Sequence, residues 1–146
     1  LAFVLEDLGR LDDAEKLSRE VVELRAKTGQ RGQDAWGEIN NLAMLLLKRD
    51  KPAEAAPLYE QLLAMCESSL PGDHYLLAIF RSNHGECLTR LGRFQDAEDE
   101  LLDAQPVLEK FFQPAHPRAA KGRERLRALY AAWNKPELAA KYETRP

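Results

Sequence analysis

The sequence predicts an all-α fold, an α-solenoid of about four antiparallel helix pairs, and three observations support this. A turn pattern recurs along the chain, and its last residues are the anchor alanines Ala14, Ala55, Ala97 and Ala139. Apolar residues before and after each turn recur at spacings of three and four, the period of a helix. No stretch shows the alternation of a strand. The turns recur with a period of about 42 residues, which is typical of stacked helical repeats.

Every turn pattern begins with a residue type that tolerates a left-handed backbone. These first residues are Gly9, Asp50, Gly92 and Asn134. Pro52 and Pro136 follow two residues after two of them, and proline suits the first turn of a helix because the N–H that it lacks would have no partner there. We therefore expect helix, tight turn and helix in each repeat.

In the first half of the chain, apolar stripes place four helices. The predicted ranges are 1–8, 12–28, 34–48 and 52–69. Their stripes are Leu1, Leu5 and Leu8; Leu17, Val21 and Leu24; Ile39, Leu42, Ala43 and Leu46; and Leu58, Leu62 and Met65. The link near residues 29–33 carries the glycine and polar residues of a loop.

The second half repeats this organisation in the ranges 74–91, 94–112, 117–133 and 136–143. Asp73 and His74 suggest an N-terminal cap for the first of these helices. The third carries the stripe Leu126, Leu129, Tyr130 and Trp133. Small residues such as Ala43 and Gly85 stand twelve residues before the anchor alanines. We expect them to let the two helices of a pair approach closely.

Composition excludes several classes of protein. The chain has 146 residues, a net charge of −3 and a longest apolar run of only six residues, at 42–47; this argues against a membrane span and general nucleic-acid binding. Residues 113–146 nevertheless carry a net charge of +5, which favours an anionic partner. Two cysteines without ligand spacing, Cys66 and Cys87, predict buried free thiols, no metal, no cofactor and a cytoplasmic protein.

The pattern resembles the tetratricopeptide repeat (TPR) family. The resemblance rests on the Leu42-Ala43 pair, the turn at Asp50, the anchor Ala55 and Tyr59. The long period and the links at 70–74 and 113–117 are similar to the variant found in kinesin light chains. The resemblance implies a right-handed superhelix in which the first helix of each pair lines a concave groove. We expect a single domain, 1–146, with repeats at 1–31 (truncated), 32–72, 73–115 and 116–146.

The resemblance implies a non-catalytic scaffold that binds a peptide or partner protein in that groove. The alternative is a regulatory or sensor module of a larger signalling enzyme, such as a bacterial Ser/Thr protein kinase, which similar repeats accompany. A hydrolase or transferase with a site of its own is a third hypothesis, but no catalytic motif supports it. We also expect self-association through the truncated first repeat, where Leu1, Phe3, Val4, Leu5 and Leu8 are apolar.

The resemblance implies which positions on the first helix of each repeat face the groove, and register to the anchor alanines then gives the candidate residues. They are Asn41, Asn83, Lys121, Arg125, Asn40, Met44, Glu86 and Arg90. By the resemblance, Asn83, Lys121 and Arg125 match part of a clamp for a C-terminal carboxylate, whereas Asn40 and Met44 depart from it. A less specific groove for an extended or acidic peptide uses the same residues. Structural asparagines and a solvated basic helix are the alternative interpretations.

Overall fold

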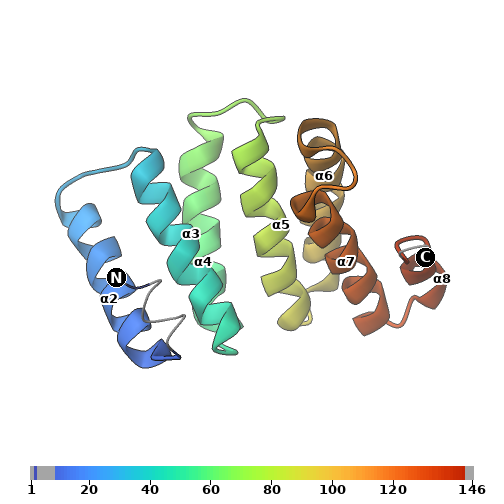
Figure 1. Cartoon of the computed structure of the whole chain (residues 1–146), viewed down its shortest axis with the longest axis horizontal. Coiled ribbons are helices and arrows are strands. Elements are labelled where there is room, and N and C mark those ends of the chain that lie inside the picture. The colour runs from blue at the N-terminus through green and yellow to red at the C-terminus, as the bar shows by residue number, and fades with distance from the viewer. Residues whose placement is uncertain (1, 3–8, 144–146) are drawn as a thin grey trace. The chain divides into compact units, whose positions relative to one another are not determined.

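The structure, a computed structural model, describes residue 2 and residues 9–143, and no residue in that part of the chain forms a strand. Its helices are α2 (Leu11–Lys27), α3 (Gln33–Lys48), α4 (Pro52–Glu67), α5 (Tyr75–Arg90), α6 (Phe94–Phe112), α7 (Pro117–Ala132) and α8 (Pro136–Ala140) (Figure 1). The chain forms two compact units, Leu1–Cys66 and Glu67–Pro146. The helix predicted at 1–8 and its apolar edge fall on residues 1 and 3–8, outside the described residues.

Helices α2 to α7 begin and end within two residues of the predicted positions. The last helix is shorter than predicted, because α8 ends at Ala140 and not at residue 143. The N–H groups of Lys141 and Tyr142 bond to the carbonyls of Leu138 and Ala139, three residues back. This is the tighter bonding of a 3₁₀ turn, which replaces the last turn of the helix.

The turn between the paired helices is the same in three repeats. Asp50, Gly92 and Asn134 have φ of 58°, 74° and 58°, as the turn pattern predicts. The next residue in each case donates its N–H to the carbonyl five residues back, as from Lys51 to Leu46 at 2.8 Å. This Schellman closure satisfies the last carbonyls of the helix and reverses the chain within three residues.

Histidines begin two of the helices that precede these turns. The Nδ1 atoms of His74 and His116 each accept a hydrogen bond of 3.2 Å, from the N–H of Leu76 and of Arg118. The predicted cap at His74 is confirmed, and His116 makes the same cap at the matching position of the next repeat. Because Nδ1 accepts, the neutral rings carry their proton on Nε2.

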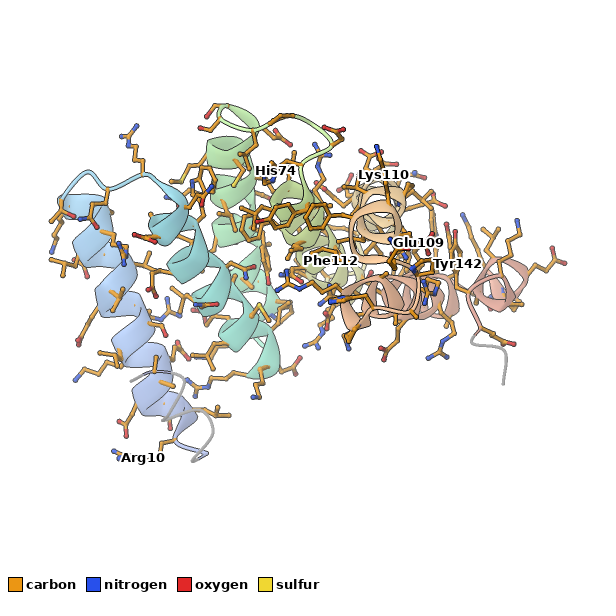
Figure 2. All side chains as sticks on the ribbon, turned by 45° about the horizontal axis from the view of Figure 1, so that its top comes forward. Arg10, His74, Glu109, Lys110, Phe112 and Tyr142 are labelled. Carbon is orange, nitrogen blue, oxygen red and sulfur yellow. The ribbon has the colours of Figure 1, made fainter. Side chains whose placement is uncertain are left out.

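An aromatic cluster lies beside these caps in the second unit. Tyr75 stacks on Phe111 with ring centroids 4.4 Å apart, and Phe112 stacks on His116 at 4.8 Å. His74 stacks on Tyr75 at 4.7 Å; His74 and Phe112 are labelled in Figure 2. These contacts hold the starts of α5 and α7 against the end of α6.

The core of the second unit forms where α5, α6 and α7 meet. Leu88, Ala97, Leu101, Leu126, Leu129 and Tyr130 pack into one buried cluster. Gly85 of α5 faces Leu101 so closely that a Cβ there would lie 2.5 Å from its Cγ. The small residue expected at this position therefore allows the two helices to approach. Cys66 and Cys87 are buried free thiols, as predicted.

Tyr130 connects this core to Tyr142, which follows α8. Its hydroxyl donates to Glu98 at 2.8 Å, and its ring lies 6.0 Å from that of Tyr142. Burial and the bond to Glu98 raise the pKa of Tyr130 above its ordinary value of 10.0. The phenol is therefore a neutral donor at any physiological pH.

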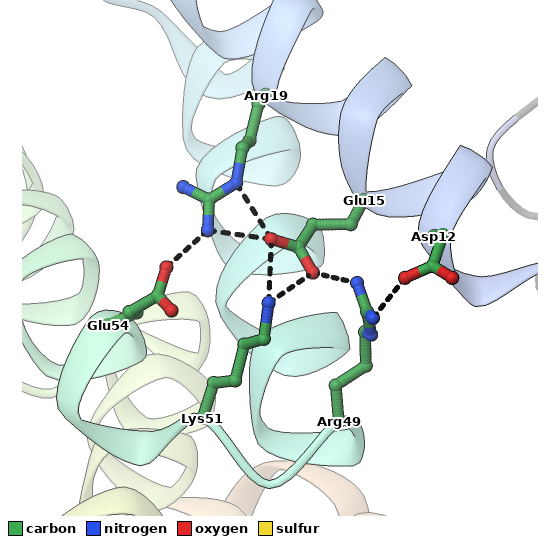
Figure 3. Close-up of polar contacts among 6 residues, drawn as sticks. All are labelled: Asp12, Glu15, Arg19, Arg49, Lys51 and Glu54. Carbon is green, nitrogen blue, oxygen red and sulfur yellow. Dashed lines mark hydrogen bonds and ion pairs between the residues drawn. The ribbon is translucent and has the colours of Figure 1, made fainter.

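In the first unit, Glu15 is the centre of an ion network (Figure 3). Its carboxylate accepts from Arg19 at 2.8 and 2.9 Å, from Lys51 at 3.0 and 3.2 Å, and from Arg49. Arg19 also contacts Glu54, and Arg49 also contacts Asp12. The network thus joins α2 to the turn after α3 and to the start of α4.

The environment of Glu15 predicts a pH dependence of stability. Burial alone would raise its pKa, but hydrogen bonds from Arg19 and Lys51 and the charges of Arg19 and Arg49 lower it below 4.5. Because the pKa is lower in the folded chain, this stabilisation is complete above the unfolded-state pKa and is lost as pH falls through the folded-state pKa. We expect wild type to lose more unfolding free energy between about pH 5 and pH 2 than Glu15→Gln does, measured by urea unfolding. Parallel pH profiles would contradict this.

Candidate functional site

The candidate site is a hollow between α5 and α7 in the second unit. The two helices are in contact, although a complete helix lies between them in the sequence. The hollow is about 230 Å³. Its lining residues are Glu86, Thr89, Arg90, Lys121, Glu124, Arg125 and Ala128. Four of the eight sequence-predicted residues, Glu86, Arg90, Lys121 and Arg125, therefore meet in one place.

Glu86 organises the charges of the hollow. Its carboxylate accepts from Nε of Arg125 at 2.9 Å and from Nη2 of Arg90 at 3.0 Å. Arg125 also donates from Nη1 to the hydroxyl of Ser82 at 3.0 Å. Nζ of Lys121 lies 3.5 Å from Oε2 of Glu124. Arg125 is thus held by two residues of α5, whereas half of the Lys121 side chain is exposed.

The other predicted residues lie elsewhere. Asn83 is on α5 but is buried, with 5% of its surface exposed, and it does not line the hollow. Asn40, Asn41 and Met44 lie on α3 in the first unit. There the side-chain amide of Asn40 lies 3.4 Å from the sulfur of Met44. Met44 is an exposed apolar side chain.

Glu124 and Ala128 also line the hollow but were not among the residues predicted from the sequence. Their signal was present, because they lie three and seven residues after Lys121 and so share its face of the helix. The basic side chains of α7 have more than one role. They are Arg118, Lys121, Arg123, Arg125 and Arg127. Arg118 lies 5.3 Å from the ring centre of Phe112, and Arg123 bonds to Glu109 at 3.0 Å. These two arginines support the structure, and Arg127 is exposed to solvent.

Among the residues that the structure describes, no cluster of three histidine, cysteine or acidic side chains could hold a metal ion. In the same part of the chain, no helix has the length and apolar character needed to cross a membrane. The residues of the hollow offer hydrogen bonds and charge.

A protein-family comparison decides the classification. The model of the tetratricopeptide repeat family matches residues 1–68 and 35–110. The chain belongs to the tetratricopeptide repeat family. This confirms the resemblance read from the turn pattern and the anchor alanines. No curated protein matches the chain.

Solved structures support the TPR fold and its long-repeat variant. A Podosopora anserina protein described as a kinesin light chain with nearly identical TPR-like repeats is 22% identical, with a TM-score of 0.86. The structure of a point variant of that protein is also 22% identical and has a TM-score of 0.88. In both comparisons the match covers 97% of this chain and 68% of the other. BtubC (BKLC) of P. vanneervenii is 23% identical with a TM-score of 0.76, covering 97% of this chain and 57% of that one. The predicted fold class, an all-α TPR-type repeat fold, is confirmed.

Proposed function

We propose that this TPR chain is a non-catalytic scaffold that binds a peptide segment of a partner protein in the hollow between α5 and α7. TPR repeats commonly serve as protein–protein interaction modules. The observation that carries the proposal is the convergence of Glu86, Arg90, Lys121 and Arg125 on one hollow. The partner segment is acidic or ends in a free carboxylate.

Charge supports this choice of partner. Three cations and two carboxylates line the hollow, which leaves a net positive charge. Arg90 and Arg125 both bond to the one carboxylate of Glu86, so an incoming carboxylate meets two guanidinium groups at the same place. Arginine suits this role because its planar fork can bind a carboxylate through two parallel bonds.

The test is fluorescence-anisotropy binding of an array of labelled acidic and C-terminal peptides. The diagnostic variant is Arg90→Ala/Lys121→Ala, since 39% and 51% of these side chains are exposed and their loss leaves the core intact. We expect about tenfold weaker binding of the peptides that wild type selects, as for the loss of a charge-assisted contact. The loss should shrink at high salt, where exposed charges are screened.

The matched control is Lys110→Ala/Arg127→Ala, which also removes two positive charges, from exposed side chains that do not line the hollow. Its affinity should stay within about twofold of wild type. Equal losses in the control and the diagnostic variant would mean that net charge, and not this hollow, attracts the peptides. If wild type selects no peptide, the proposed function is wrong.

A further inference from the structure

An ion pair recurs in the second unit at matching repeat positions. Arg81 bonds to Glu67 at 3.2 Å, and Arg123 bonds to Glu109 at 3.0 Å. The glutamate precedes the arginine by the same number of positions in each pair, and the two pairs are separated by one full repeat. The pair is therefore a repeated structural feature.

One repeat earlier, in the first unit, the matching positions are Ala26, twelve residues after the anchor Ala14, and Ile39, sixteen residues before the anchor Ala55. Apolar residues therefore replace both members of the ion pair, and Arg25 directly precedes Ala26. Nη1 of Arg25 donates to Gln30 at 2.9 Å, and Nη2 lies 3.7 Å from Glu38. Its Nε is buried and has no hydrogen-bond partner in the described part of the chain. A buried donor without an acceptor costs about 1–3 kcal/mol.

A hollow of about 230 Å³ lies at this altered position. Ala35 and Ile39 of α3 form its buried floor, Val22 and Met65 line its walls, and Arg25 and Arg31 add positive charge. No carboxylate is among its lining residues. All of these residues belong to the first unit.

We propose that this hollow binds an apolar side chain that is followed or preceded by a carboxylate in a partner peptide. The volume is below the roughly 300–1,000 Å³ of clefts for drug-sized ligands, so it suits an anchoring side chain. The apolar floor binds the side chain, and the two arginines bind the carboxylate. This site lies on other helices than the proposed α5–α7 site and does not depend on it.

Methyl NMR of the whole chain tests the site with a defined probe, acetyl-Glu-Leu-Glu-amide. We expect saturable shifts of the methyl signals of Val22, Ile39 and Met65. Two control peptides separate the contribution of the apolar side chain from that of the carboxylates. Acetyl-Lys-Leu-Lys-amide keeps the apolar residue, and acetyl-Glu-Ser-Glu-amide keeps the negative charges. Each control should bind at least about tenfold more weakly. No shift with any peptide, or equal affinity for the acidic and basic peptides, would overturn the proposal.

The decisive variant is Ala26→Glu/Ile39→Arg, which installs the residue pair of the other two repeats at two residues that line the hollow. It should fill the hollow, keep the helical circular dichroism and weaken the probe about tenfold or more. If this variant does not fold, Arg31→Glu replaces it, because Arg31 is exposed; the preference should then shift from the acidic to the basic peptide. Unchanged affinity in a folded variant would place the probe elsewhere and overturn the proposal.

The last experiment compares the methyl spectra of the chain at several protein concentrations without peptide. Methyl shifts that depend on protein concentration alone would mean that a second copy of the chain occupies the hollow, and the peptide proposal would be wrong. Concentration-independent spectra together with probe-dependent shifts support it. Binding at the α5–α7 hollow, followed on the methyl group of Ala128, is scored separately.

Discussion

Replacing Glu15 with glutamine is expected to lower the free energy of unfolding of the first unit by about 2–3 kcal/mol. Only 9% of the Glu15 side chain is exposed, and it accepts from Arg19, Arg49 and Lys51. Glutamine keeps the size but removes the charge, so three cations lose their common partner. Removing one partner of a fully buried pair costs about 3–5 kcal/mol, and the partly exposed cations here reduce that value.

Trp36 makes this measurement specific to the first unit, because it is buried on α3. Urea unfolding would follow its fluorescence in a Trp133→Phe background. The controls are Asp12→Asn and Glu54→Gln, whose side chains are 90% and 50% exposed. Each should cost less than about 1 kcal/mol, as surface pairs do. A Glu15→Gln loss no greater than that of the controls would show that the network acts only as a set of surface pairs.

Replacing Gly85 with alanine should destabilise the second unit by about 1–2 kcal/mol, although alanine is the better helix former. The new Cβ would lie 2.5 Å from Cγ and 2.6 Å from Cδ2 of Leu101. Leu101 is buried in the core cluster and has little room to move. Overpacking of about 1–3 kcal/mol therefore exceeds the helix-propensity gain of up to about 1 kcal/mol.

The matched control is Gly37→Ala, at a helical glycine of α3 where a Cβ would meet nothing within 4 Å. It should stabilise the chain by about 0.5–1 kcal/mol. Thermal unfolding by circular dichroism measures both variants. Adding Leu101→Ala to Gly85→Ala should cost less than the sum of the two single changes, because the clash is relieved. If Gly85→Ala were as stabilising as Gly37→Ala, the close approach of α5 and α6 would be refuted.

The sequence alone predicted the structural features that depend on residues close together in the chain. Asp50, Gly92 and Asn134 indicated the left-handed turns, and all three have positive φ. The regular recurrence of these turns then placed α5 and α7 in matching register. Register to the anchor alanines, together with the family resemblance, placed eight residues in one candidate set, and four of them, Glu86, Arg90, Lys121 and Arg125, line one hollow.

The sequence could not identify which face of α2 is buried. Its apolar stripe contains Leu24, which is 61% exposed, while Ala14, Glu15 and Ser18 are buried. Helical periodicity describes one helix, whereas burial depends on the neighbours that pack against it. In sequence, Glu15 reads as one more acidic residue of a charged helix.

The sequence by itself determined the helices α2 to α7, the turns at Asp50, Gly92 and Asn134, the repeat length and the family, because each depends on residues close together in the chain or on their regular recurrence. Only the tertiary structure decided that Glu15 is the centre of an ion network, that Glu86 accepts from two arginines, and that Arg25 and Ile39 line a hollow. These features join residues from different helices. Their geometry depends on how side chains meet across those helices, which no local pattern contains.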